Sequence, residues 1–152
     1  MKKIVVLCMF PKLNLPPAAL KIVKKYDSHS VWCQIRNNYL LLTPEEWVRQ
    51  HCINYLVNHK NYLKGRLASE YALKIGDHTR RCDLLYFDEF GKPLLIVECK
   101  ATSVLLDEKT FLQTSNYVAS TGARFFWMTN GLQHVIVDCI DGINYIEEIP
   151  NL

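Results

Sequence analysis

The sequence lacks the features of a membrane-spanning, exported or zinc-binding protein. No apolar segment of its 152 residues is long enough to cross a bilayer. Residues 1–8 resemble the start of a signal peptide, but the apolar stretch is very short and no small-residue cleavage site follows it, so we expect a first strand there. None of the six cysteines falls in a C-x-x-C pair or stands at zinc-finger spacing from the five histidines. An even cysteine count permits three disulfides, whereas the lack of export signals favours reduced thiols in a cytoplasmic protein.

The chain also has little net charge and no motif for a nucleotide-driven motor. Its formal charge is only +3, which permits nucleic-acid binding without arguing for it, because a strong electrostatic footprint would be more basic. No G-x-x-x-x-G-K-[ST] phosphate loop is present. Internal repeats and low-complexity tracts are absent as well. With 49% apolar and 22% charged residues, the chain has the composition of a globular domain with a real core.

Residues 1–42 are predicted to form a strand-rich N-terminal extension, or an interaction arm, ahead of a main domain at residues 43–152. Within this extension, apolar runs at 20–23 and 31–35 flank the polar segment 27–30, a pattern typical of a hairpin.

The main domain opens with a strong helix start. Thr43 is a good N-cap, Pro44 suits the first helical position, and Glu46 completes a capping box. We expect this helix to run to about Asn58.

The remainder of the chain alternates strands with one more helix. In chain order, the expected elements are strands at 70–75, 80–87 and 93–99, a helix at 107–120, and strands at 124–128, 135–139 and 143–148. Short turns join the first three strands, so they are expected to form an antiparallel meander. The crossover helix predicts that strands 93–99 and 124–128 are parallel. The expected fold is therefore α/β, with a mixed sheet flanked by helices.

Charged residues interrupt two neighbouring apolar strands. The run Leu94–Val97 ends in Glu98-Cys99-Lys100, and Asp83 opens the apolar part of the preceding strand. Because the start of one antiparallel strand lies beside the end of the next, Asp83 should come near Glu98 and Lys100. Two close carboxylates repel unless a cation lies between them, and Mg²⁺ (or Mn²⁺) takes oxygen ligands. We therefore predict Asp83 and Glu98 as metal ligands, with the Cys99 carbonyl as a further ligand and Lys100 as the catalytic group that acts on the phosphate or on the attacking water.

Two other acids are candidates for the same site. Glu70 is expected to lie roughly opposite Asp83 or Leu84 and is predicted as a further metal ligand or as a residue that holds one in place. Glu45 shares the inward face of the first helix, but a negative charge near a helix N-terminus has an ordinary structural explanation too. The Asp83/Glu98/Lys100 spacing alone is common, and a solvated salt bridge at a strand end would give the same pattern.

These residues resemble the PD-(D/E)xK nuclease superfamily, and more closely the N-terminal nuclease domain of type I restriction enzyme R subunits in a short stand-alone form. The resemblance includes the helix motif Gln113-x-x-x-Tyr117 and covers nearly the whole chain. The similar segments are 13–16, 42–50, 91–93, 97–101, 129–134 and 147–150. Cys82 stands where the superfamily name places proline. The resemblance implies a restriction-endonuclease-like core, with Asp83 and Glu98 as metal ligands, Lys100 as the catalytic lysine, and Gln113 and Tyr117 beside the site.

The sequence thus supports two hypotheses. The first is Mg²⁺-dependent hydrolysis of DNA phosphodiester bonds, as a restriction- or defence-related endonuclease. The second is a catalytically inactive module of a restriction system that binds nucleic acid or protein. Expected partners are DNA and other restriction-system subunits, with no membrane. A homodimer is compatible with the resemblance, because many enzymes of this superfamily pair to cut two strands.

Overall fold

The computed structural model describes residues 9–152, so the strand expected within residues 1–8 lies outside the described part of the chain. In chain order, the elements are β1 (Ile22–Lys25), β2 (Ser28–Cys33), β3 (Asn38–Leu41), α2 (Pro44–His59), η1 (Lys64–Arg66), β4 (Leu67–Ile75), β5 (His78–Phe87), β6 (Pro93–Cys99), α3 (Glu108–Ala119), β7 (Phe125–Thr129), β8 (His134–Asp138) and β9 (Asn144–Ile146). Each helix and strand predicted for the main domain is present, with ends shifted by a few residues at most.

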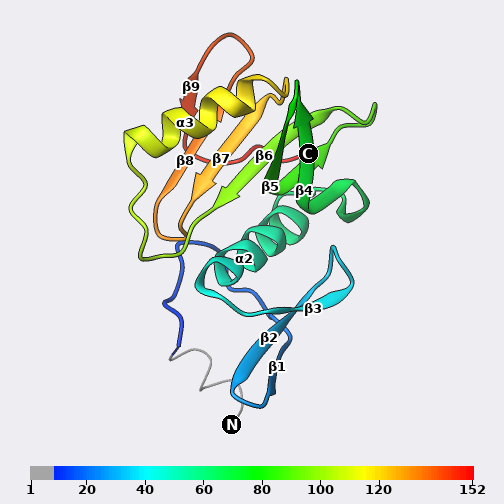
Figure 1. The fold of residues 1–152 in the computed structure, drawn as a ribbon, viewed down its shortest axis with the longest axis vertical. Coiled ribbons are helices and arrows are strands. Elements are labelled where there is room, and N and C mark those ends of the chain that lie inside the picture. Colours follow the sequence, from blue (N-terminus) through cyan, green and yellow to red (C-terminus); the bar gives the residue numbers. More distant parts are fainter. Residues whose placement is uncertain (1–8) are drawn as a thin grey trace.

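The main sheet has six strands in the order β4-β5-β6-β7-β8-β9 (Figure 1). Strands β6 and β7 are parallel, and the other neighbouring pairs are antiparallel. Helix α3 is the connection between the two parallel strands. The predicted mixed α/β sheet and its parallel pair are therefore confirmed.

The two faces of this sheet bury separate hydrophobic clusters. Leu84 and Val97 pack with residues of α2, including Val48 and Ile53. The alternate strand positions, such as Ile96, pack on the other face with residues of α3. Because successive strand side chains point to opposite faces, the near-continuous apolar runs of β5, β6 and β7 supply both clusters.

Helix α2 lies between the two sheets (Figure 1). The small sheet has the order β1-β2-β3, and its residues Val31 and Cys33 are fully buried in the same cluster as α2. The predicted hairpin is confirmed, with β1 paired to β2, but β3 was not expected. Residues 9–42 share a core with the main domain, and the predicted division at residue 42 stays a prediction.

The segment around Leu13 docks on the turn after β7. The Asn14 N–H donates to the Gly131 carbonyl at 2.8 Å, and the Asn14 amide donates to the Leu132 carbonyl at 2.8 Å. Gly131 has a φ of +84°, and a Cβ there would lie 2.7 Å from Leu13 Cδ2. Two of the family-like sequence segments, 13–16 and 129–134, are therefore parts of one contact, and this contact requires glycine.

The structure bears on two general properties of the described residues, the state of their thiols and the presence of membrane-spanning helices. The cysteines of the described residues, at positions 33, 52, 82, 99 and 139, are free. No helix in residues 9–152 has both the length and the apolar character needed to cross a membrane.

Candidate active site

Asp83 and Glu98 lie next to each other on neighbouring strands. Leu84 on β5 pairs with Val97 on β6, and one step further along this ladder places Asp83 across from Glu98. The Cys99 N–H donates to Asp83 Oδ2 at 2.8 Å, which fixes the Asp83 carboxylate against the end of β6. The structure thus brings together the two acids that the strand pattern predicted to be neighbours.

Crowding with Asp83 changes the proton affinity of Glu98. Burial raises the pKa of Glu98, and the charge of Asp83 and a hydrogen bond with it raise this pKa further, to about 8, although Lys100 and Arg80 act to lower it. A carboxyl group that retains its proton near neutral pH is the expected result when two acids share a site without enough positive charge.

Lys100 follows directly at the end of β6. Its backbone N–H donates to the Thr129 carbonyl of β7 at 2.8 Å, so the parallel strand fixes its position. Its positive charge lowers the pKa of both Glu98 and Glu45, which places the ammonium among the acids of the site.

Arg49, which the sequence analysis did not single out, is the central cation of this cluster. It projects from α2, and its side chain is only 7% exposed. Its Nη2 donates to Asp83 Oδ1 at 2.6 Å, and its Nη1 donates to Glu46 Oε2 at 2.8 Å. Burial acts to lower the pKa of Arg49, but Asp83 and Glu46 raise it above its ordinary value. In this structure Arg49 therefore compensates the charge of the predicted metal ligand.

The predicted capping box at the start of α2 is only half formed. Thr43 Oγ1 accepts the Glu46 N–H at 3.1 Å, as expected for an N-cap. The reciprocal bond is absent, because the Glu46 carboxylate instead accepts from Arg49 and from Gln50, each at 2.8 Å. The Thr43 N–H donates to the Leu41 carbonyl. The predicted reciprocal bond of the capping box does not form because a nearby buried guanidinium is a stronger partner for a carboxylate than a backbone amide.

Glu70 lies across from Asp83 on β4, as predicted. Its carboxylate forms ion pairs with Arg36 and, at 3.5 Å, with Arg49. Its backbone is left-handed, with φ +52°, and the strand changes its packing there: Leu67 belongs to the α2 cluster, whereas Leu73 packs in the α3 cluster. Glu70 is therefore held beside the site by two arginines, and its role as a metal ligand stays a prediction.

Glu45 stands at the more open edge of the cluster. Its side chain is 47% exposed and lies 3.7 Å from Arg49 Nη2. Burial raises the pKa of Glu45, and the charge of Asp83 raises it further. Glu45, Glu46, Arg49 and Glu70 line a cavity of about 490 Å³ together with Thr43, Pro44 and Ala101. This cavity gives solvent a path to the acids.

Gln113 and Tyr117 both belong to α3, where their spacing predicts one helix face. Gln113 is exposed. The helix packs on the sheet through Phe111, which stacks on Phe126. The roles that the resemblance implies for this pair stay predictions.

The donor set of the site fits a magnesium-type ion only in part. Among the described residues, no three His, Cys, Asp or Glu side chains converge as a metal-binding group. However, Mg²⁺ is often held by one or two carboxylates, with waters and substrate phosphate completing its shell, and adjacent Asp83 and Glu98 suit that arrangement. Both Asp83 oxygens already have partners, in Arg49 and the Cys99 N–H. An ion bound to Asp83 would thus have to share this carboxylate with Arg49 or displace it.

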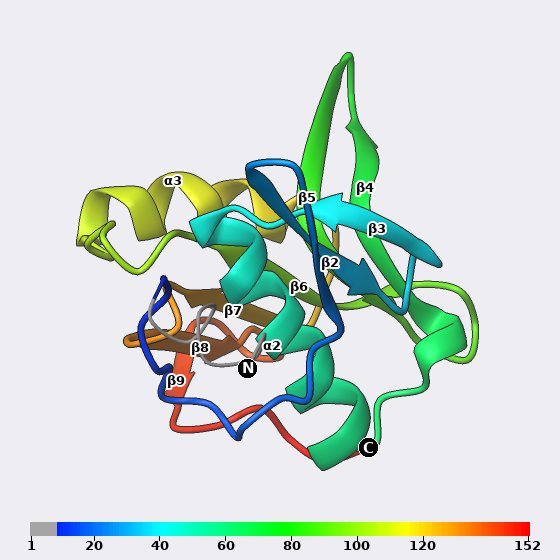
Figure 2. The same cartoon turned by 90° about the horizontal axis from the view of Figure 1, so that it is seen from below.

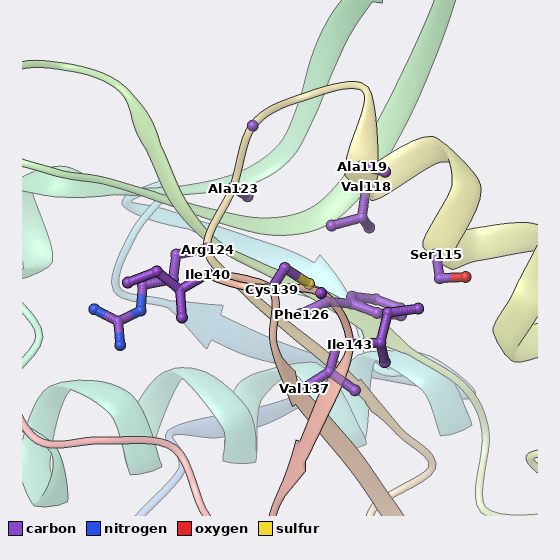
Figure 3. A pocket seen from close by; sticks show the side chains of 12 residues that line it. Ser115, Val118, Ala119, Ala123, Arg124, Phe126, Val137, Cys139, Ile140 and Ile143 are labelled. Carbon is purple, nitrogen blue, oxygen red and sulfur yellow. The ribbon is translucent and has the colours of Figure 1, made fainter.

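A second cavity lies away from these acids. It has a volume of about 460 Å³ between the end of α3, the start of β7 and the loop after β8 (Figure 3). Apolar side chains such as Val118, Phe126 and Ile143 dominate its lining, and Arg124 is its one charged residue. It lacks the acidic groups that metal-dependent hydrolysis requires.

Comparisons with known proteins found a matching family and similar solved structures. Residues 44–152 match the family of the type I restriction enzyme R protein N terminus. The fold is similar to a fragment assigned as the HsdR subunit of a type I restriction enzyme from Vibrio vulnificus, with TM-score 0.54 and 18% identity over 72% of this chain and 24% of that chain. A protein from Anabaena variabilis assigned as a nuclease gives TM-score 0.46 and 13% identity over 83% of this chain and 80% of the other. The search of curated proteins found no match.

The chain therefore belongs to the family of type I restriction enzyme R protein N-terminal domains. This confirms the resemblance drawn from the sequence segments, and the structural similarity to the Vibrio fragment confirms the fold. The chain spans about a quarter of the length of that solved subunit.

Proposed function

We propose that this domain hydrolyses DNA phosphodiester bonds with Mg²⁺ or Mn²⁺ as its cofactor. The observation that carries the proposal is the pairing of Asp83, within β5, with Glu98, near the end of β6, with Lys100 beside them. Family membership supports a restriction-related role for the domain.

Each residue has a distinct part in this proposal. Asp83 and Glu98 would hold the ion, which supplies a polarised phosphoryl oxygen and a more acidic bound water. Lys100 would stabilise the negative charge that develops on the phosphate, or orient the attacking water. The Cys99 N–H holds Asp83 in place, and Glu45 has room to approach the ion from the cavity side.

The buried ion pairs favour a second candidate function. Arg49 already compensates Asp83, so this carboxylate is stable in the fold without an ion. A domain of this kind can serve as an inactive module that binds nucleic acid or protein in a restriction system. The similarity to a subunit fragment makes other restriction-system subunits the proposed partners in either case.

A plasmid-nicking assay with Mg²⁺ or Mn²⁺ distinguishes the two functions. The variant Lys100→Ala is expected to lower the rate by about 10²–10³-fold, because it removes a group that acts mainly on the transition state. Its DNA affinity is expected to stay nearly unchanged. Lys92→Ala is the matched control, since Lys92 is an exposed lysine in the turn before β6. Equal rates for Lys100→Ala and wild type would reject the proposed roles, and DNA binding without cleavage under either metal would support the inactive module.

A further inference from the structure

The net charge of the chain is small, but its positive and negative residues are unevenly distributed along the sequence. Residues 9–42 contain five Lys and Arg residues and only one acid, Asp27. Residues 43–152 contain eleven Lys and Arg and fourteen Asp and Glu, a net charge of −3. The part with the candidate active site is therefore acidic overall. Contacts with the negatively charged phosphates dominate the affinity of most proteins for DNA. If this protein binds DNA, the positive charge that attracts the phosphates therefore has to lie outside residues 43–152.

The small N-terminal sheet has one buried face and one outward face. On the inner face, the cross-strand row Ile22–Val31–Leu40 packs against the core. The neighbouring row, Val23–Ser30–Leu41, belongs to the other face, and its Val23 and Leu41 are 38% and 61% exposed. The outward face therefore has no partner among the described residues of the chain.

Lysines and aromatic rings share this outward face. Trp32 pairs with Tyr39 across β2 and β3, and their rings meet edge to face. The Lys21 ammonium lies 5.8 Å from the centre of each ring. Lys25 stands at the hairpin end next to Tyr26, which is 86% exposed. Ammonium groups that contact phosphates, next to rings that stack on bases or sugars, are the usual components of a sequence-independent nucleic-acid surface.

The same sheet reaches the candidate active site. Arg36, in the turn between β2 and β3, forms an ion pair with Glu70. Glu70 in turn lies 3.5 Å from Arg49, which contacts Asp83 at 2.6 Å. Figure 2, which views the structure from below, shows β2 and β3 on the viewer's side of α2. A DNA backbone that follows the N-terminal sheet toward Arg36 would thus arrive next to the paired carboxylates of Asp83 and Glu98.

We propose that the outward face of the N-terminal sheet, formed by Lys21, Lys25, Trp32 and Tyr39, binds the DNA backbone and delivers it to the site. This inference rests on the proposed function only in taking DNA as the partner. Charge complementarity selects DNA: the polyanion is attracted to this face and repelled by the acidic remainder of the domain.

The test is DNA binding by the full chain in EDTA, where cleavage has no part. Fluorescence anisotropy of a labelled duplex of arbitrary sequence is followed over a range of salt concentrations. The double variant Lys21→Gln/Lys25→Gln is expected to reduce the slope of log K against log salt by about 2, because each lysine that contacts a phosphate contributes about one unit. The matched control is Lys64→Gln/Lys109→Gln, two exposed lysines outside this sheet, and it is expected to keep the wild-type slope.

A second readout concerns the aromatic pair. DNA is expected to quench tryptophan fluorescence in the wild type, and Trp32→Phe is expected to lose most of this change, because Trp47 and Trp127 are buried. Equal salt slopes for the two double variants would overturn the proposal, and so would a larger reduction of the slope in the control variant. Fluorescence quenching that persists in Trp32→Phe would overturn it as well. Failure of Lys100→Ala to reduce nicking rejects the catalytic proposal but leaves this binding result intact.

Discussion

Replacing Arg49 with methionine is expected to destabilise the metal-free protein by about 3–5 kcal/mol, the usual cost of removing one partner from a buried ion pair. The two partners that determine this cost are Glu46 and Asp83, whose side chains are 7% and 13% exposed. Glu45 and Glu70 are more exposed and are solvated when Arg49 is lost, so they contribute little. Methionine preserves much of the side-chain volume and removes only the charge and the hydrogen bonds.

The assay is urea unfolding at neutral pH in EDTA, supported by thermal melting. For a protein of this size, the expected loss corresponds to a fall in Tm on the order of 10 °C. Arg124→Met is the matched control. Arg124 also pairs with an aspartate, Asp138 at 2.8 Å, but it is 46% exposed, and its loss is expected to cost no more than about 1 kcal/mol. Similar losses in the two variants would refute the role assigned to Arg49.

A second arm of this experiment adds Mn²⁺. In the wild type, an ion at Asp83 has to compete with Arg49, whereas in Arg49→Met it supplies the missing positive charge. Manganese is therefore expected to raise the Tm of Arg49→Met by more than that of the wild type. When the manganese concentration is 100 times Kd, its binding is expected to raise the free energy of unfolding by about 2.7 kcal/mol. Equal shifts in the two proteins would show that the ion and Arg49 do not share a carboxylate.

Two further predictions concern pH and the turn after β7. Because the pKa of Glu98 is about 8 in the fold and 4.5 ordinarily, the folded state holds a proton between these values that the unfolded state lacks. Stability in EDTA should thus fall as pH rises from 4.5 to 8, and Glu98→Gln should flatten that fall in urea titrations at several pH values; parallel curves would contradict the shared site with Asp83. Gly131→Ala should destabilise the protein by more than the roughly 1–2 kcal/mol expected for its left-handed backbone, because the new Cβ also meets Leu13. Gly76→Ala, with φ +59° and open space around it, measures the backbone part alone, and equal losses would mean that Leu13 moves without cost.

The pairing of Asp83 with Glu98 could be predicted because local rules determine it. Short turns dictated an antiparallel β5–β6 pair, and the end of each apolar run gave the register. The crossover helix likewise dictated that β6 and β7 are parallel. These inferences need only the chain order and the alternation of side chains along a strand.

Arg49 and β3 could not be found in the same way, because long-range packing determines both. Strand β3 is only four residues long, with the sequence NYLL, and a short apolar run of this kind is assigned to a strand only by its pairing with β2. Helix α2 is covered by a sheet on two sides, so its buried residues include Glu46, Arg49 and Gln50 as well as apolar ones. A helix buried in this way shows no clear polar face. The sequence offered one signal for the role of Arg49. Several charged residues lie in the first turns of this helix, next to a strand that ends in an acidic residue.

The geometry of Arg49 explains why this position calls for arginine in particular. One guanidinium nitrogen contacts Glu46 on its own helix, and the other contacts Asp83 on β5. The planar fork therefore holds α2 and β5 at a fixed separation, whereas a lysine ammonium is a compact charge on a flexible stem and lacks two separate nitrogens to span both carboxylates. Because Asp83 is also held by the Cys99 N–H, this fork sets the distance between the helix and the two strands that carry the paired acids. A divalent ion could replace the charge of Arg49 on Asp83, but it could not replace the link to Glu46, so the helix and the acids are coupled through one residue.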